Sequence, residues 1–385
     1  MAATVVLAAF NVANFPVGGG HFWVYMQYAL GLRRCGCQVF WLERFVRGAD
    51  AAEDRSAIEM FFERMTAFGL GGRAILMVIP DPRRGPAGRP EFLGLAEPEA
   101  HAVFRRADLL LNFHYAIDPD LIGRFRRTAL VDIDPGLFQF WLSRGQLAVP
   151  RHDVYFTIGE TVGQAGGLIP DCGLSWVRTR PAVCLEAWPY AHDPRSRAMT
   201  TVSAWDGGDW VVDDEVHYEN TKRVSFLEFR ELPRRTEQAL ELALFLRTAA
   251  DAAERELMER HGWRVRLSRE VAGTPEDYRR YIRGSRGEFS CAKPSCMRFQ
   301  NAWVSDRTLC YLASGKPVVL QDTGPSRFLP NGEGMFRFST LEQAATALAA
   351  VNDDYERHCR AARALAETYF DATRVVRGIL EAALA

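Results

Sequence analysis

The stretch Ser305–Phe338 reads SDRTLCYLASGKPVVLQDTGPSRFLPNGEGMFRF, and it decides the fold. Its first or second residue can cap a helix over 306–313, whose amino end offers unpaired N–H groups and a positive dipole. The apolar residues 317–321 predict a strand buried on both faces, followed by a tight turn over 322–325. Because ligands of parallel α/β sheets bind at the carboxyl ends of the strands, we expect this turn to border a binding site.

The amino-terminal part of the chain alternates strand-length apolar runs with stretches of helical spacing. Such alternation predicts a parallel sheet with helices on both faces. Glycines and prolines crowd residues 165–200, where we place the crossing between two domains. The strands are expected at residues 4–10, 38–42, 74–79, 109–112, 129–133 and 154–158, and the helices at about 21–34 and 51–68.

A second alternating unit follows the crossing. The sequence therefore predicts an α/β protein of two Rossmann-like domains, residues 1–190 and 191–365, closed by a terminal helix over 366–385. In the second unit we expect strands at 200–205, 264–267 and 317–321, helices at about 235–261, 275–282 and 306–313, and a helical tail over 341–385.

The composition excludes several classes of protein. The chain has 385 residues, 48% hydrophobic and 25% charged, with a formal net charge of −1, so it is neither disordered nor fibrous. A net charge this close to zero gives no field for binding nucleic acid or an anionic membrane. Asn11, Asn14 and Pro16 interrupt the apolar run before the first charged residue, Arg33, so no membrane span is expected. The eight cysteines include no Cys-x-x-Cys pair, which favours a reducing, cytoplasmic location.

Four motifs in the carboxyl-terminal part follow one another at fixed spacing. They are Ala313–Val319 (ASGKPVV), Asp322–Gly324, Gly332–Gly334 and Ser339–Glu342. In this order they resemble the donor-binding domain of nucleotide-sugar-dependent glycosyltransferases with the GT-B fold, most closely over residues 285–385. The resemblance implies two Rossmann-like domains that face each other across a cleft, the first binding the acceptor and the second the donor. It also implies that the terminal helix crosses back onto the first domain.

The sequence departs from the family pattern in two places. Retaining members of the family usually carry Glu-x7-Glu just before the Gly-Lys-Pro, and the aligned residues here are Ala302 and Cys310. Phe328 stands where many members have a glutamate that binds the ribose of the donor. Contacts to the nucleotide must therefore come from other residues, and the nearest carboxylates are those of Glu288 and Asp306.

Basic residues near these motifs are candidates for binding the donor diphosphate. The chain has three lysines, and GT-B enzymes commonly have a basic residue near the position of the first of them, Lys222. With Lys293 and Arg307, this lysine would neutralise charge on the leaving nucleotide. The alternative is that both lysines are solvated at the surface. The predicted donor-binding residues are Lys222, Glu288, Lys293, Ser305, Asp306, Arg307, Asp322, Thr323 and Gly324.

Two histidines are candidates for a general base. In inverting GT-B enzymes that resemble plant and antibiotic glycosyltransferases, a histidine at the start of the first helix takes the proton of the acceptor hydroxyl. His21 has this position, and a neutral imidazole suits the role. His114, which follows the strand at 109–112, is the second candidate. Either could instead be a packed or helix-capping histidine.

The acceptor is expected to meet two pairs of residues in the first domain. Gly19 and Gly20 would let the backbone approach the ligand closely, and Asp132 and Asp134 would contact it. The Asp-x-Asp spacing of the second pair also matches a metal-binding pattern. Because the pair ends a strand of the first domain, away from the donor motif, we predict no metal site there.

The leading hypothesis is a metal-independent hexosyltransferase that needs no cofactor. It would move a sugar from a UDP-, dTDP- or GDP-linked donor to a hydroxyl of a small natural product or a saccharide. The missing glutamate pair and His21 favour inversion. Two alternatives stay open: a sugar-nucleotide epimerase of the same fold, and a non-catalytic protein that binds a nucleotide sugar or activates a partner. The excess of arginine over lysine indicates a GC-rich bacterium, in which natural-product biosynthesis or cell-surface glycosylation is a fitting role.

Overall fold

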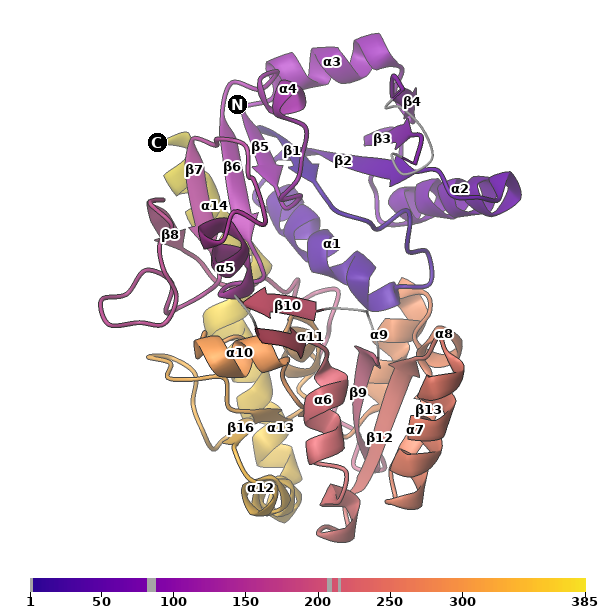
Figure 1. Ribbon diagram of the computed structural model, residues 1–385, viewed down its shortest axis with the longest axis vertical. Helices are drawn as coiled ribbons and strands as arrows, with labels where there is room; N and C mark the ends of the chain where they lie inside the picture. Colours follow the sequence, from indigo (N-terminus) through magenta and orange to yellow (C-terminus); the bar gives the residue numbers. More distant parts are fainter. Residues whose placement is uncertain (1–2, 82–87, 206–209, 214–215) are drawn as a thin grey trace.

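The computed structural model describes residues 3–81, 88–205, 210–213 and 216–385. Two large sheets lie one beyond the other along the long axis of the molecule, each flanked by helices (Figure 1). The amino-terminal half of the chain forms the first sheet and the carboxyl-terminal half forms the second. This arrangement confirms the two Rossmann-like domains that the alternation of strands and helices predicts.

The first sheet has eight strands in the order β4-β3-β2-β1-β5-β6-β7-β8, and only β4 runs antiparallel to its neighbour. Its central strands are buried on both faces, which explains their uninterrupted apolar sequences. The strands are β1 (Thr4–Ala8), β2 (Gln38–Val46), β3 (Ala74–Ile79), β4 (Glu91–Leu93), β5 (Leu109–Asn112), β6 (Thr128–Asp132), β7 (Val154–Thr157) and β8 (Trp176–Arg178). The helices are α1 (Gly19–Arg34), α2 (Ala51–Ala67), α3 (Glu97–Arg106), α4 (Pro119–Ile122) and α5 (Leu137–Ser143).

The second sheet has six parallel strands in the order β13-β12-β9-β14-β15-β16. A separate hairpin of β10 (Trp210–Asp213) and β11 (Val216–Glu219) precedes its first helix. The strands are β9 (Ala198–Ala204), β12 (Ala239–Phe245), β13 (Arg264–Leu267), β14 (Gly287–Ser290), β15 (Val318–Gln321) and β16 (Met335–Phe338). The helices are α6 (Lys222–Glu228), a short 3-10 turn (Leu232–Arg234), α7 (Ala249–Arg260), α8 (Ser268–Val271), α9 (Pro275–Gly284), α10 (Pro294–Phe299), α11 (Asp306–Ala313), α12 (Leu341–Asp353) and α13 (Tyr355–Leu365).

One sequence prediction is wrong: residues 235–261 do not form one long helix. They form β12, a loop and then α7, whose capping residue is Thr248. The segment ALELALF of β12 consists mostly of good helix formers, but it lies between β9 and β13 in the sheet. Leu240, Leu242 and Leu244, spaced by two, all enter the core of the second domain. Burial in the sheet therefore overrides the local helical propensity.

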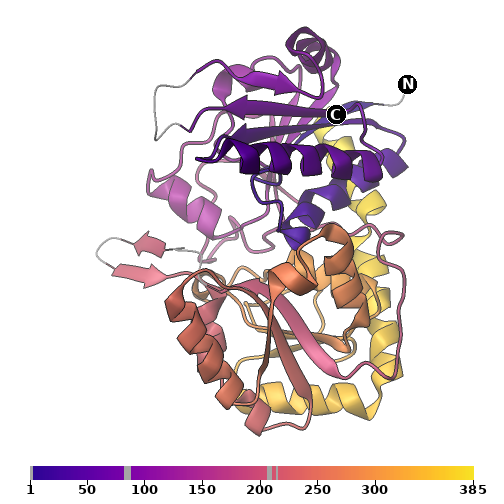
Figure 2. The ribbon, with the colours of Figure 1, turned by 90° about the vertical axis from the view of Figure 1, so that its right-hand side faces the viewer.

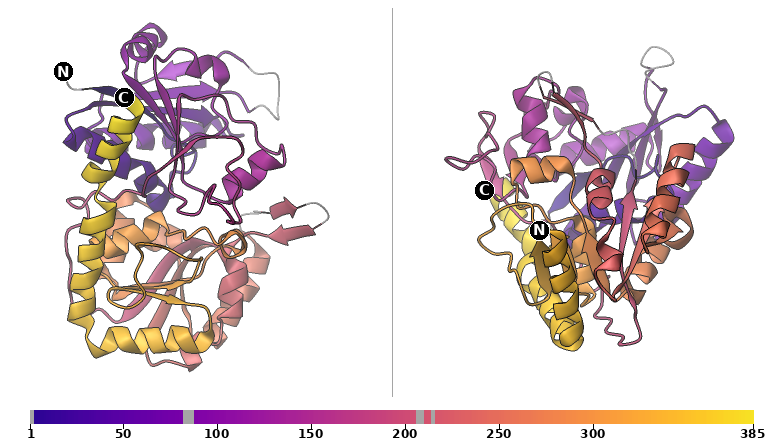
Figure 3. Two further views of the ribbon diagram at one scale, coloured as in Figure 1. Left: turned by 90° about the vertical axis from the view of Figure 1, so that its left-hand side faces the viewer. Right: turned by 60° about the horizontal axis from the view of Figure 1, so that its bottom comes forward.

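The tail of the chain returns to the first domain, as the resemblance implies. After α13, a π-helical turn (Ala366–Phe370) leads into α14 (Ala372–Leu384), which packs on α1 (Figure 3). A Cβ on Gly31 of α1 would lie 2.8 Å from the carbonyl oxygen of Ala372, so glycine permits this close approach. Val183, in the segment that first crosses between the domains, pairs with Asp371 beside the same turn.

The amino end of α1 rests on the second domain (Figure 2). The indole Nε1 of Trp23 donates a hydrogen bond to the carbonyl oxygen of Pro275, the first residue of α9 (3.0 Å). Apolar side chains of both domains, including Trp188 and Tyr278, continue one core across this contact. Among the described residues, no helix is both long and apolar enough to cross a membrane.

Candidate functional site

The loops after β14 and β15 bring the predicted donor residues to the edge of the second sheet that meets the first domain. The Asn301 side chain donates to the carbonyl of Pro135 (2.7 Å), and the Thr161 hydroxyl donates to the carbonyl of Gln300 (3.2 Å). Because all strands of this sheet are parallel, their carboxyl ends lie along one edge, where α/β proteins bind ligands.

A buried ion pair forms the base of the predicted donor site. Arg307, in the first turn of α11, donates from Nε to Oε1 of Glu288 in β14 (2.6 Å). Its other nitrogens donate to the carbonyl of Val202 (2.8 Å) and the hydroxyl of Ser290 (2.6 Å). The second carboxylate oxygen of Glu288 has no hydrogen-bond partner among the described residues. Both predicted residues thus lie together, and their hydrogen bonds are directed at each other and at neighbouring strands.

Lys222, at the start of α6, lies beside this pair. Its ammonium group is 5.1 Å from the centre of the Trp303 ring, a cation–π contact. Burial and the positive charges of Arg307 and Lys293 lower the pKa of Lys222, and Glu288 and Asp306 raise it; the resulting pKa is about 7. Lys222, Lys293 and Arg307 therefore lie near one another, and the protonated form of Lys222 is destabilised there.

The amino end of α11 supplies two further predicted residues. Ser305 caps the helix, with its hydroxyl accepting a hydrogen bond from the backbone N–H of Arg307 (3.3 Å). Asp306 stands at the junction of the domains: its charge influences Lys222 in the second domain and His21 in the first. Its carboxylate thus connects the donor residues with the candidate base.

The predicted turn after β15 packs against the loop that precedes α11. The Thr323 hydroxyl donates to the carbonyl of Trp303 (3.0 Å), and Asp322 forms an ion pair with Arg337. Gly324 has a φ of +116° and lies so close to Gln300 that a Cβ would approach its backbone to 2.7 Å. The turn therefore holds in place the loop that positions Trp303 over Lys222.

The ring of His21 is oriented by the backbone of the first domain. Its Nε2 is 2.7 Å from the carbonyl oxygen of Phe10, which can only accept, so Nε2 carries the proton and Nδ1 carries the lone pair. Burial lowers the pKa of His21, against the effects of this hydrogen bond and of Asp306. The imidazole is therefore neutral at pH 7, with Nδ1 as its basic atom.

His114, the second candidate, is more deeply enclosed. Its ring stacks on Phe10 with centroids 4.9 Å apart, and its Nε2 has no hydrogen-bond partner among the residues described. Burial and the charge of Arg44 lower its pKa to about 4. Phe10 thus contacts both candidate histidines, through its carbonyl oxygen and through its ring.

The structure gives the four predicted acceptor residues other contacts. Both oxygens of the buried Asp132 are bonded, by the Gln139 amide (2.7 Å), the Thr157 hydroxyl (2.7 Å) and the backbone N–H of Asp134 (2.9 Å). These bonds shape the loop after β6 rather than leaving a carboxylate free for a ligand. A Cβ on Gly19 would lie 2.3 Å from the Thr274 carbonyl, and one on Gly20 would meet Tyr278, so the close approach is to the second domain. Contact of these residues with an acceptor stays a prediction.

Comparison with known proteins supports the fold. No family model matches the chain, and no curated protein matches its sequence. Solved structures match over its whole length. An α-glucosyltransferase in complex with UDP-glucose and DNA containing an abasic site has a TM-score of 0.62 and 9% identity, covering 100% of both chains. Anabaena Alr3699/HepE in complex with UDP-glucose has a TM-score of 0.59 and 12% identity, covering 98% of both. Sucrose-phosphate synthase from Thermosynechococcus elongatus has a TM-score of 0.58 and 10% identity, covering 99% of this chain and 98% of that one.

The chain has the GT-B glycosyltransferase fold. Ala302 and Cys310 stand at the two positions where retaining GT-B enzymes usually have the glutamate pair. Ala302 has a left-handed backbone (φ 54°) and donates its N–H to the carbonyl of Thr323 (3.0 Å), and Cys310 is buried in α11. Neither position offers a carboxylate or hydroxyl oxygen.

Sequence reasoning missed two residues beside the site of this GT-B protein. Glu43 of β2 is buried, and its carboxylate accepts hydrogen bonds from the backbone N–H of Ala13 (2.7 Å) and the indole of Trp41 (3.0 Å). Burial raises its pKa to about 7, in spite of these bonds. A charged residue inside the apolar run QVFWLERFV is the signal that could have identified it. Trp303 was overlooked because one aromatic residue among many carries no recognisable pattern.

The described residues include no group of three or more His, Cys, Asp or Glu side chains that could hold a metal ion. The two carboxylates of the Asp-x-Asp pair have different surroundings. Asp132 is buried and accepts hydrogen bonds from Gln139 and Thr157, whereas Asp134 is half-buried and its charge raises the pKa of Tyr25 and of Cys296.

Proposed function

We propose that this protein is a glycosyltransferase that moves a hexose from a nucleoside-diphosphate sugar to a hydroxyl acceptor, with inversion and without a metal ion. The observation that carries the proposal is the cluster of Lys222, Lys293 and Arg307 at the carboxyl edge of the second sheet. A buried lysine whose charge is disfavoured in the free protein gains most from a bound anion. The diphosphate of a donor is such an anion, and it gains negative charge as the sugar leaves.

His21 is the proposed general base. Its lone pair on Nδ1 would accept the proton of the acceptor hydroxyl while the oxygen attacks the anomeric carbon and the bond to the diphosphate breaks. The hydrogen bond to the Phe10 carbonyl would steady the imidazolium that forms. Asp306, whose negative charge acts on the ring, would stabilise the same cation. The absence of a glutamate pair at Ala302 and Cys310 supports direct displacement over a retaining mechanism.

The donor is a UDP-, dTDP- or GDP-linked sugar in this proposal. The structural neighbours crystallised with UDP-glucose favour UDP as the first nucleotide to test. The acceptor would be a small natural product or a saccharide bound by the loops of the first domain. A bacterial cytoplasmic enzyme of natural-product biosynthesis fits the arginine-rich composition and the free cysteines.

The first test is a thermal-shift panel of UDP, dTDP, GDP, ADP and CDP. The matching nucleotide is expected to stabilise the folded protein by about 2.7 kcal/mol at a concentration of 100 Kd. Incubation with the corresponding nucleotide sugar and an acceptor panel should then release the nucleoside diphosphate. NMR of the product is expected to give the anomeric configuration opposite to that of the donor.

The two histidines offer a matched pair for the catalytic part of the proposal. His21→Gln is expected to lower the turnover about 100-fold or more, with the nucleotide Kd unchanged, because a general base contributes to the chemical step alone. His114→Gln, at a buried position that also contacts Phe10, is expected to retain activity. The reverse result would identify His114, and not His21, as the general base.

The same assays separate the alternatives. An epimerase would convert the nucleotide sugar when no acceptor is present, and the product would still carry the nucleotide. A non-catalytic protein would show the thermal shift but release no nucleoside diphosphate, with or without His21. Either result would overturn the transferase proposal, while leaving the nucleotide site intact.

A further inference from the structure

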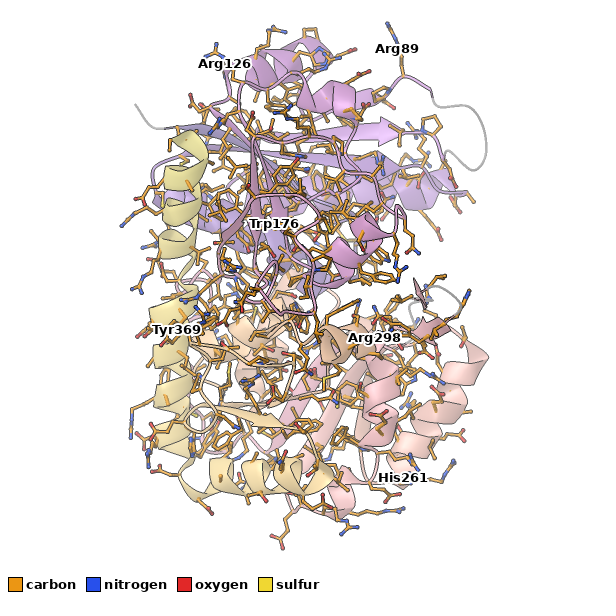
Figure 4. All side chains as sticks on the ribbon, turned by 60° about the vertical axis from the view of Figure 1, so that its left-hand side comes forward. Arg89, Arg126, Trp176, His261, Arg298 and Tyr369 are labelled. Carbon is orange, nitrogen blue, oxygen red and sulfur yellow. The ribbon has the colours of Figure 1, made fainter. Side chains whose placement is uncertain are left out.

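A hollow lies where the two domains meet beside the terminal helix. Its volume is about 530 Å³, and its lining comes from three parts of the chain. Glu160 and Arg180 belong to the segments after β7 and β8, Arg327 and Phe328 to the loop after β15, and Tyr369 to the π-helical turn. Figure 4 labels Tyr369 at this junction of the terminal helices. None of these residues is among the predicted donor or acceptor residues, but Phe328 stands at the position where many GT-B members have a glutamate that binds the donor ribose.

The lining carries an excess of positive charge. It includes four arginines, Arg178, Arg180, Arg327 and Arg374, and one carboxylate, that of Glu160. Arg178 donates to the carbonyls of Glu160 and Val162 and Arg374 to that of Thr368, and these neutral partners leave both charges uncompensated.

The carboxylate of Glu160 is itself occupied. It accepts hydrogen bonds from the Ser326 hydroxyl and from the backbone N–H of Arg327, both at 2.6 Å. These bonds fasten the loop of the second domain to the first domain. Among the described residues, no hydrogen bond or ion pair to the guanidinium groups of Arg180 and Arg327 is found. Two guanidinium groups therefore face the hollow with their donors available.

One of these guanidinium groups is held in a fixed orientation. Arg180 stands 3.9 Å from the centre of the Phe328 ring and 5.0 Å from that of Tyr369. The two rings lie 5.3 Å apart and form one aromatic wall. A guanidinium packed on aromatic rings presents its N–H groups at its edge, which is the geometry that binds a phosphate with two hydrogen bonds. Burial lowers the pKa of Arg180, while the negative charge of Glu160 acts in the opposite direction.

We propose that this hollow binds an organic phosphate ester. Arg180 and Arg327 would bind the phosphate group, and the organic part would lie against Phe328 and Tyr369. Because the lining comes from both domains and from the terminal helix, the ligand would hold the three together. The lining shares no residue with the predicted donor-binding set. Because Phe328 stands where many GT-B members bind the donor ribose, the test includes saturating UDP, so that binding at the donor site is distinguished from binding in the hollow.

The test is calorimetric titration of the full-length protein in the presence of saturating UDP, with phenyl phosphate as the probe. We expect phenyl phosphate to bind at least about tenfold more tightly than inorganic phosphate or phenol, since it offers both the charge and the ring. Benzoate, which has the ring and a carboxylate, is expected to bind about tenfold more weakly than phenyl phosphate because it has fewer acceptor oxygens.

Variants locate the binding. Arg327→Ala removes an exposed side chain and is expected to weaken binding of phenyl phosphate at least about tenfold. Arg180→Lys, which keeps the charge but loses the planar fork, is expected to do the same. Arg126→Ala, at the far end of the first domain (Figure 4), is the control and should change nothing. The proposal is overturned if phenyl phosphate gives no binding at millimolar concentration, if UDP displaces it, if Arg327→Ala leaves its Kd unchanged, or if benzoate binds equally well.

Discussion

The second domain buries two of its lysines at opposite ends of its sheet. Lys222 lies beyond the carboxyl ends of the strands, over Trp303 and beside Arg307. Lys316 lies before the amino end of β15, is fully buried, and its Nζ has no hydrogen-bond partner among the described residues. Burial lowers the pKa of both, to about 7 for Lys222 and about 8 for Lys316.

The difference between the two lies in their surroundings. Arg307 and Lys293 oppose the charge of Lys222, while Glu288 and Asp306 favour it, and Trp303 lies over its ammonium group. Around Lys316, two arginines likewise oppose its charge, while Cys359 and Asp193 favour it. A lowered pKa alone therefore does not mark a binding site. What distinguishes the two lysines is their position relative to the strand ends, and ligands of parallel α/β sheets bind at the carboxyl ends.

The largest expected effect is on stability, and it comes from the Arg307–Glu288 ion pair beside Lys222. Arg307→Ala leaves the buried carboxylate of Glu288 without its partner, so the free energy of unfolding should fall by about 3–5 kcal/mol. Urea unfolding measures this loss. The double variant Glu288→Gln/Arg307→Met should lose less than Arg307→Ala, because no uncompensated charge remains. An equal loss in both variants would mean that packing, and not charge, accounts for the effect.

Nucleotide binding separates the two lysines directly. Lys222→Met is expected to weaken binding of the matching nucleoside diphosphate about 100-fold, or about 2.7 kcal/mol, since a buried charge-assisted contact is lost. Lys316→Met, the matched control, should leave the Kd unchanged. Calorimetric titration of the two variants and the original protein gives both values. If both substitutions weakened nucleotide binding equally, the cause would be a loss of domain stability rather than the loss of a contact to the nucleotide.

The pH dependence of binding sharpens the same distinction. The folded-state pKa of Lys222, about 7, lies below its unfolded value of 10.5, so in the free protein the amine loses its proton as the pH rises above 7. A bound diphosphate restores that proton, and affinity should therefore decline above pH 7 by up to about tenfold per pH unit. Titrations in Tris and in HEPES should reveal proton uptake. Lys316→Met should keep this slope and Lys222→Met should abolish it; a flat profile in the original protein would contradict the role of Lys222.

The smallest effect is expected at Lys316 itself. Lys316→Met replaces a buried ammonium by an apolar chain of similar length, so stability at pH 7 should rise by about 1 kcal/mol. The sign follows from the lowered pKa: the folded state holds the proton less tightly than the unfolded state, which penalises folding below about pH 8. The gain should shrink as the pH rises from about 8 towards the unfolded pKa of 10.5. Thermal unfolding over this pH range measures it, and a destabilised variant at pH 7 would contradict the expectation.

The fold could be predicted well where the sequence pattern has one physical cause. Strands such as β1 and β5 are buried on both faces and read as apolar runs, and Ser305 and Gly315 frame α11. The prediction for β12 was wrong because a leucine- and alanine-rich segment is compatible in composition with either a strand or a helix. Only their spacing by two, at 240, 242 and 244, distinguishes the strand.

The site was less accessible to prediction, because its contacts join distant parts of the chain. The sequence indicates Arg307 and Glu288 separately, but their ion pair depends on how α11 packs on β14. A Cβ on Gly19 would meet Thr274, the cap of α9, and one on Gly20 would meet Tyr278 of α9, both more than 250 positions later. No local pattern records such a meeting of two domains.

The pairing of Val183 with the terminal turn has a mechanical consequence. The chain passes between the domains twice, and the two passages are joined by hydrogen bonds from the Val183 N–H to the Phe370 carbonyl (2.8 Å) and from the Ala372 N–H to the Val183 carbonyl (2.9 Å). The two passages are therefore bonded to each other as well as to the domains, so movement of one passage is transmitted to the other. A domain rotation that alters the separation of His21 and Asp306 would have to move both passages together.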